Sequence, residues 1–155
     1  TDIIRWVFLD NIHLTLCFLG NISNDYIPNI IQSIENCITS KYLKITIDGT
    51  GVFPSSNTPK ILWMGISKGV DELTSLQQDI EKSVRKFKEN NRKEKFIPHI
   101  TIARIRRSQR KIDVLPFLDI VYSPIEIDIN SIYLFESRLL PERVLYTVLN
   151  KFSLN

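Results

Sequence analysis

The chain contains two histidines, and each opens the same four-residue pattern. His13 begins H-L-T-L and His99 begins H-I-T-I, so an apolar residue separates each histidine from a threonine. In an extended segment, side chains two residues apart point to the same face. The pattern therefore predicts an imidazole beside a hydroxyl twice, His13 with Thr15 and His99 with Thr101.

Two such pairs suit chemistry at a phosphorus atom. An in-line displacement needs a base on one side and an acid on the other, and histidine serves either role because its ordinary pKa is about 6.5. A threonine hydroxyl can donate a hydrogen bond to a non-bridging phosphate oxygen. A single copy of the pattern is typical of a structural histidine, whereas two copies that use both histidines favour a site. The copies lie 99 − 13 = 86 residues apart, which is enough for each to sit in its own lobe across a cleft.

The elements around these patterns predict an α+β fold. Apolar residues at helical spacing indicate helices at about 24–39 and 70–90 and a short helical segment at 112–118. Strand patterns cover 12–19, 42–48, 60–67, 96–105, 123–136 (as one long strand or two short ones) and 143–149, and residues 49–59 form a turn-rich loop. This order predicts mostly antiparallel sheets that line a central cleft, with helices outside. The strand–helix–strand unit occurs twice, so we expect a single domain, residues 1–155, of two pseudo-symmetric lobes.

Composition narrows the class of protein. A chain of 155 residues is about one domain. It has no apolar run near the roughly 20 residues of a membrane helix and no secretory signal pattern. Cys17 and Cys37 both fit small core residues in a reducing compartment, so we expect a cytoplasmic monomer with no membrane association. The net charge of +3, with a basic run at 104–111, fits an anionic ligand.

The segments around the two histidines resemble the paired signatures of the 2H phosphoesterases. The first is H-L-T-L-C-F-L-G at 13–20, and the second is P-H-I-T-I-A-R at 98–104. The branch they resemble most is the RNA 2′,3′-cyclic phosphodiesterases, also called 2′-5′ RNA ligases or LigT-like proteins. Further similarity at 51–55, 61–66, 133–139 and Tyr146 extends the resemblance over nearly the whole chain.

The resemblance implies a LigT-like fold that hydrolyses a 2′,3′-cyclic phosphate to a 2′-phosphate, with RNA ends or nucleotides as partners. It implies that His99 is the proton acceptor that activates water and that His13 is the proton donor to the departing O3′. Thr15 and Thr101 would hold the phosphate oxygens, with no metal and no other cofactor. Ligation of RNA ends would then be a weak reverse reaction.

Three further residues are candidates for substrate binding. Arg104 matches the family's arginine after the second motif, although strict alternation points it away from His99 unless the strand bends there. An ion pair between the lobes is the other interpretation of Arg104. Phe53 and Tyr146 could stack on a base, and core packing is the alternative for both.

Two departures from the family pattern stand out. Relatives usually begin with a strand and a helix before the first motif, and this chain has a dozen residues there. We therefore expect that part of the first lobe to be missing, which would expose a sheet edge. The position of Cys17 is commonly basic in relatives. Alternation places Cys17 on the cleft face with His13, so one positive charge near the phosphate would be absent.

The sequence leaves other functions open. A related enzyme could act on 2′-5′-linked oligonucleotides or on an ADP-ribose cyclic phosphate. A non-catalytic module that binds nucleotides could keep the same cleft. Two histidines and Cys17 could also hold zinc, although no pair of ligands has the usual close spacing.

Overall fold

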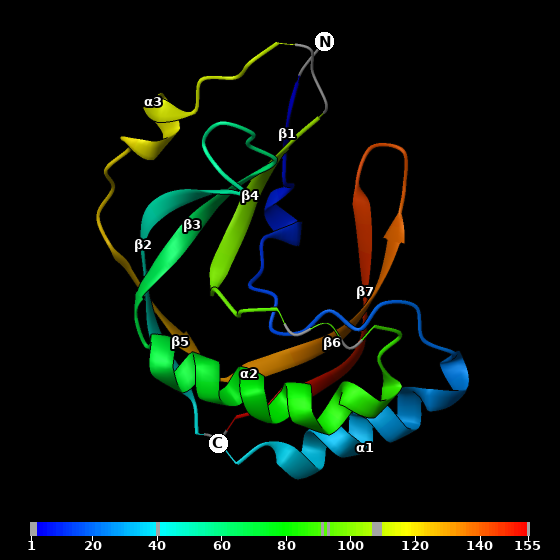
Figure 1. The fold of residues 1–155 in the computed structure, drawn as a ribbon. Coiled ribbons are helices and arrows are strands. Elements are labelled where there is room, and N and C mark those ends of the chain that lie inside the picture. Colours follow the sequence, from blue (N-terminus) through cyan, green and yellow to red (C-terminus); the bar gives the residue numbers. More distant parts are fainter. Residues whose placement is uncertain (1–2, 40, 91, 93, 107–109, 155) are drawn as a thin grey trace.

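Five strands form one antiparallel sheet in a computed structural model of the chain, which describes residues 3–39, 41–90, 92, 94–106 and 110–154. Their order across the sheet is β1 (Ile4–Trp6), β4 (His99–Ile105), β3 (Ile61–Lys68), β2 (Leu43–Phe53) and β5 (Ile125–Ile129). A hairpin of β6 (Ser131–Leu139) and β7 (Val144–Ser153) makes the second sheet. Figure 1 shows the five-stranded sheet and the hairpin standing above the helices. The expected α+β architecture with antiparallel strands is confirmed.

Two helices lie side by side beneath these sheets (Figure 1). Helix α1 (Ile27–Cys37) follows a 3₁₀ turn, η2 (Asn24–Tyr26), and has Pro28 in its first turn, where a missing N–H costs nothing. Helix α2 (Val70–Val84) continues into η3 (Arg85–Phe87). A third helix, α3 (Leu115–Leu118), is one turn long. All three were expected, and none of the described helices has the length and apolar character that crossing a membrane requires.

The main core lies between the two long helices and the sheets. One stripe of α2 is buried, as its apolar spacing predicts, and Leu76 on that stripe is fully inaccessible to solvent. Ile30 and Ile34 of α1 complete the helical side, and Ile45 and Phe152 come from the two sheets. A smaller core on the five-stranded sheet contains Leu62, Ala103 and Val114. The opposite face of this end of the sheet does not contribute to the small core.

Two expected elements differ in the structure. Residues 12–19 do not form a strand, because Leu14 is the only residue of this segment with a bridge partner. The loop expected at 49–59 begins later, since β2 runs on to Phe53 through a bulge around Gly49. Gly49 has a φ of +72°, which a glycine adopts without steric cost, so the strand can continue past it.

The two strand–helix–strand units predicted from the sequence differ in the structure. The unit β3–α2–β4 is present, but its counterpart lacks the first strand. Before the first motif the described residues form β1 and a 3₁₀ turn, η1 (Leu9–Asn11). Strand β6 pairs with β7 on one side, and no other described strand pairs with its second edge.

The helical core gives a prediction for stability. We expect Leu76→Ala to lower the free energy of unfolding by about 2–5 kcal/mol, because it leaves a cavity among fully buried side chains. Urea denaturation measures this change. The control is Gln78→Ala on the exposed side of the same helix, expected within about 0.5 kcal/mol of the unaltered protein. Equal effects of the two substitutions would contradict the assignment of the core.

Candidate active site

A single backbone bridge joins the two histidine motifs. Leu14 pairs with Ile100 in antiparallel orientation. Residues directly opposite in such a pair share a face, so this register puts His13 opposite Thr101 and Thr15 opposite His99. The two histidines are then diagonal neighbours, with Cα atoms roughly 7–8 Å apart. The motifs therefore lie next to each other at one edge of β4, and the structure brings all four side chains to one face.

Both imidazole rings are anchored in the same way. Nδ1 of His13 lies 2.6 Å from the backbone oxygen of Asn11, and Nδ1 of His99 lies 2.6 Å from that of Ile97. A carbonyl oxygen can only accept a hydrogen bond, so each Nδ1 carries a proton. In both rings Nε2 is thus the nitrogen that gains or loses a proton. One ring can act as a base at Nε2 while the other, when charged, acts as an acid at the same atom.

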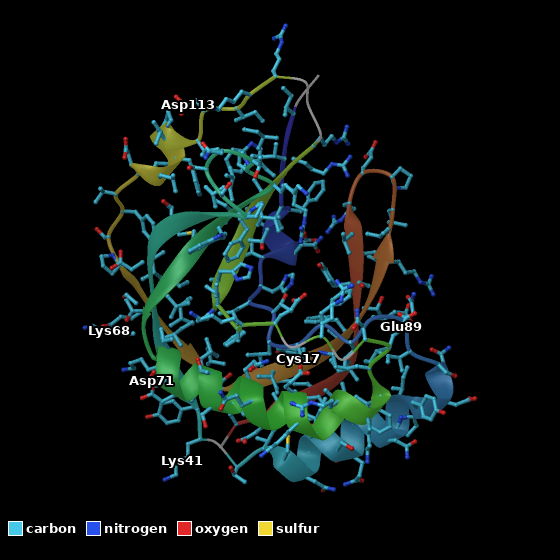
Figure 2. The ribbon with its side chains drawn as sticks, viewed as in Figure 1. Cys17, Lys41, Lys68, Asp71, Glu89 and Asp113 are labelled. Atoms are coloured by element: carbon cyan, nitrogen blue, oxygen red, sulfur yellow. The ribbon has the colours of Figure 1, made fainter. Side chains whose placement is uncertain are left out.

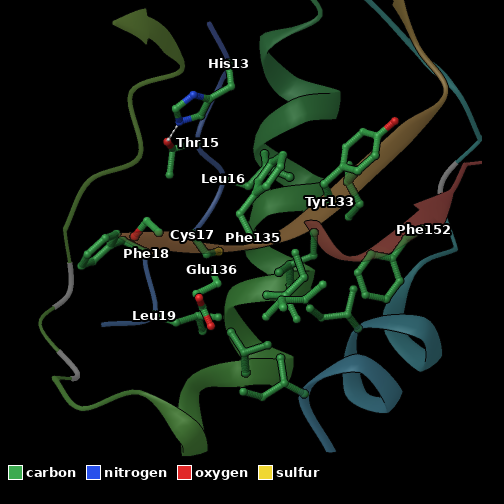
Figure 3. A pocket seen from close by; sticks show the side chains of 18 of the residues that line it. His13, Thr15, Leu16, Cys17, Phe18, Leu19, Tyr133, Phe135, Glu136 and Phe152 are labelled. Carbon is green, nitrogen blue, oxygen red and sulfur yellow. Dashed lines mark hydrogen bonds between the residues drawn. The ribbon is translucent and has the colours of Figure 1, made fainter. Parts of the chain in front are cut away.

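Thr15 contacts the reactive nitrogen of its own motif. Its Oγ1 lies 3.1 Å from Nε2 of His13, the contact drawn as a dashed line in Figure 3. The hydroxyl can donate to the neutral ring and can accept from the charged one. The imidazole nitrogen and the hydroxyl oxygen of the first motif therefore address the same small volume.

Aromatic rings support each histidine from the side. Tyr146 of β7 meets His13 edge to face, with ring centroids 5.0 Å apart. Phe53 of β2 meets His99 in the same manner at 4.9 Å, and Trp63 of β3 lies 5.9 Å from His99. Phe53 and Tyr146, both candidates from the sequence, thus flank the two motifs. Trp63, which lies in the strand predicted at 60–67, was not predicted as a residue of the site.

Arg104 shares a face with the second motif, although alternation alone points it away. Trp63 pairs with Thr101 and Leu62 pairs with Ala103, which leaves Ile102 as an extra residue in β4. Such a bulge shifts the alternation by one residue. Arg104 pairs with Ile61, which is on the same side of β3 as Trp63, and so it joins the face of His99 and Thr101. Residues 107–109 of the basic run that follows lie outside the described residues.

The irregular segment that carries His13 is held by the beginning of β7. The Asn11 side-chain amide donates to the backbone oxygen of Val144 at 2.7 Å. Arg143 donates to Oδ1 of Asn11 at 3.2 Å and forms an ion pair with Asp10 at 2.9 Å. Asn11 is also the residue whose backbone oxygen accepts from His13. The sequence analysis missed these residues, and the available signal was the position of Asn11, two residues before His13.

Cys17 does not lie on the face of the histidines, which corrects the expectation from alternation. Its sulfur lies 3.9 Å from the backbone oxygen of Gln77 on α2, and Figure 2 shows the residue beside that helix. The segment is not a regular strand, so side-chain alternation does not apply to it. Burial, reinforced by Glu81, raises the pKa of the Cys17 thiol to about 12.

The neutral thiol of Cys17 is a poor metal ligand, because metals bind the thiolate. Across the described parts of the chain, no group of three or more histidine, cysteine, aspartate or glutamate side chains is arranged to hold a metal ion. The two histidines therefore have no third ligand among these residues that would make them a metal centre.

A cavity of about 810 Å³ opens beside the first motif. His13 and Thr15 lie at one end of it, as Figure 3 shows. Segment 12–22, the inner faces of α1 and α2, and strand β6 form its walls, largely from apolar side chains. His99 is not among the lining residues. Apolar walls offer little to a phosphate, so the polar chemistry belongs at the end where the two motifs adjoin.

Comparison with solved structures agrees with this fold. A crystal structure from Thermus thermophilus superimposes with a TM-score of 0.73 at 26% identity, covering 98% of this chain and 82% of that one. A crystal structure of Escherichia coli LigT with 3′-AMP gives a TM-score of 0.73 at 22% identity, covering 98% of this chain and 81% of that one. The LigT-like fold expected from the two motifs is confirmed.

Comparison with curated sequences identifies the family. The RNA 2′,3′-cyclic phosphodiesterase of Aquifex aeolicus is 33% identical over 97% of this chain and 81% of the relative. The protein of the same name from Thermotoga maritima is 32% identical over 93% of this chain and 76% of the relative. The 2′-5′ RNA ligase superfamily matches residues 9–139. This chain belongs to the 2′-5′ RNA ligase superfamily.

Proposed function

We propose that this protein hydrolyses the 2′,3′-cyclic phosphate at RNA ends or on nucleotides, yielding a 2′-phosphate. The observation that carries the proposal is the pair of adjacent imidazoles, each with its Nδ1 proton bound to a backbone carbonyl. This arrangement leaves both Nε2 atoms as the nitrogens that can exchange protons, with that of His13 next to the Thr15 hydroxyl. The relatives named RNA 2′,3′-cyclic phosphodiesterase support the choice of substrate.

The reaction uses one histidine on each side of the phosphorus. Nε2 of His99 takes a proton from water as the water oxygen bonds to phosphorus. The bond from phosphorus to O3′ breaks, and O3′ receives a proton from Nε2 of His13. The products are a 2′-phosphate and a free 3′-hydroxyl. Both rings then return to their starting states by exchanging protons with solvent.

Three polar side chains stabilise the charge on the phosphate. The hydroxyls of Thr15 and Thr101 donate to the non-bridging oxygens, where negative charge increases during attack. Thr15 is suited to this because its hydroxyl already lies 3.1 Å from Nε2 of His13. Arg104 lies on the same face as Thr101, and its planar guanidinium can donate paired hydrogen bonds to the phosphate.

The aromatic side chains orient the nucleotide. Phe53 lies against His99 and Tyr146 lies against His13. A base that extends from the bound phosphate toward either histidine therefore comes near an aromatic ring. Stacking on a protein aromatic contributes about 1–3 kcal/mol per base and tolerates any base. We therefore propose broad acceptance of the terminal base. The crystal structure of LigT with 3′-AMP gives a precedent for a nucleotide bound in this fold.

Removal of either histidine tests the two-histidine mechanism. We expect His13→Ala and His99→Ala each to lower kcat on adenosine 2′,3′-cyclic phosphate by roughly 100-fold or more, because each removes one proton-transfer group. Chromatographic separation of the 2′-phosphate product measures the rate, and thermal unfolding checks that both variants fold. A variant that folds and keeps most of its activity would exclude that histidine from the reaction.

The pH dependence tests whether one acid and one base are required. We expect kcat/KM to rise and then fall with increasing pH, since His99 must be unprotonated and His13 protonated. Initial rates between pH 5 and 9 measure this profile. A flat profile over that range is incompatible with the mechanism.

Chelation separates this mechanism from metal catalysis. We expect EDTA to leave the rate unchanged, because the two histidines and the threonines supply the chemistry themselves. The same assay on 2′-5′-linked dinucleotides and on ADP-ribose cyclic phosphate compares the related substrates. Loss of activity after chelation, with recovery on adding back zinc, would replace the proposal with a metal-dependent one. Nucleotide binding without turnover of any of these substrates would indicate a non-catalytic module.

A further inference from the structure

Four residues form a continuous row across the five-stranded sheet. Phe53 pairs with Ile61, Ile61 pairs with Arg104, and Arg104 pairs with Arg5 of β1. Directly opposite residues in antiparallel strands share a face, so all four lie on the face that carries His99 and Thr101. The row begins with an aromatic ring at one end and finishes with two guanidinium groups at the other.

The two arginines face each other without an acidic partner. Like charges directly opposite on neighbouring strands destabilise a sheet. Among the described residues no carboxylate forms an ion pair with Arg5 or Arg104, and both side chains are exposed. The polar contact of Arg5 is a long one, from its guanidinium to the backbone oxygen of Pro141 at 3.5 Å. An anion bound between the two guanidinium groups would relieve this repulsion.

We propose that Arg5, which lies opposite Arg104, binds the 5′-phosphate of the nucleotide that carries the cyclic phosphate. The inference rests on the proposed function, because it takes the two motifs as the site of the cyclic phosphate. Arg104 follows Thr101 by three residues of strand, roughly 10 Å, and Arg5 lies one strand beyond Arg104, so Arg5 is farther from the cyclic phosphate than Arg104 is. A terminal nucleotide has one other phosphate, the one on its 5′ oxygen, which links it to the rest of the RNA. Guanidinium groups bind phosphate through paired hydrogen bonds, so the site favours RNA ends over isolated nucleosides with a cyclic phosphate.

A pair of substrates that differ in one phosphate tests this directly. Adenosine 2′,3′-cyclic phosphate is compared with the same compound bearing a 5′-phosphate. We expect the unaltered protein to prefer the 5′-phosphorylated compound by about tenfold in kcat/KM, as one charged hydrogen-bonding contact would give. We expect Arg5→Gln to reduce this preference to near one, while kcat/KM for the compound without the 5′-phosphate stays within about twofold.

Lys68→Gln is the matched control, because it removes one positive charge from an exposed site at the other end of β3 (Figure 2). Ile61 is the residue of β3 that pairs with Arg104, and Lys68 follows it by seven residues, roughly 23 Å along the strand. We expect Lys68→Gln to keep the full preference. Salt dependence gives a second measure, since Arg5→Gln should reduce the slope of log KM against log salt for the 5′-phosphorylated compound by about 0.7.

Three results would overturn the inference. An equal loss on both substrates would mean that Arg5 only holds the hairpin through Pro141. An unchanged preference in Arg5→Gln would mean that the 5′-phosphate binds elsewhere. No preference in the unaltered protein would mean that the site does not exist.

Absence of turnover on both substrates would defeat the proposed function alone. Calorimetric binding of adenosine 2′-phosphate and adenosine 2′,5′-bisphosphate then decides the inference. The bisphosphate must bind more tightly, and this advantage must disappear in Arg5→Gln. Equal binding of the two compounds by the unaltered protein would overturn it.

Discussion

The backbone bridge between Leu14 and Ile100 is the constraint on which the site depends. One pair of residues brings together segments 86 positions apart and sets each histidine opposite the other motif's threonine. The arrangement is close to a local twofold axis, because both rings use the carbonyl two residues earlier and at the same distance of 2.6 Å. The backbone holds both histidines in the same way. One can therefore act as the base when neutral while the other acts as the acid when protonated, and this pair of roles needs no metal between them.

The symmetry ends at the supports of the two motifs. His99 begins strand β4, which pairs with β3 along its length, and Phe53 and Trp63 lie against its ring. Gly51 allows this, since a Cβ at that position would overlap the Trp63 indole. His13 stands in an irregular segment, and its position comes from side chains instead, through Asn11 and Arg143 at the start of β7. The first motif therefore depends on the hairpin, whereas the second depends on the sheet.

These differences explain how far the sequence alone could predict the molecule. Apolar spacing identifies α2 and its buried stripe because a helix satisfies its own backbone, so local pattern is sufficient. Segment 12–19 has the alternation of a strand, but a strand needs a partner, and alternation carries no information about partners. The orientation predicted for Cys17 was wrong for that reason, because it assumed a regular strand. The four motif side chains were identifiable because their types and repetition are themselves chemical information, whereas the register that joins them depends on contacts between distant residues.

The bulge at Ile102 is the clearest case of a feature outside the reach of pattern reasoning. One extra residue in β4 turns Arg104 from the side of the buried Ala103 to the side of Thr101. Without it, a guanidinium would enter the small core around Leu62 and Val114, where burying an unpaired charge is costly. The bulge thus solves a packing problem and an electrostatic one together. It keeps the core side of β4 apolar up to its end, and it continues the polar face of the motif toward β1. The same step in register puts Arg104 in one row with Phe53, so the sheet face that carries His99 and Thr101 also carries an aromatic ring and a positive charge.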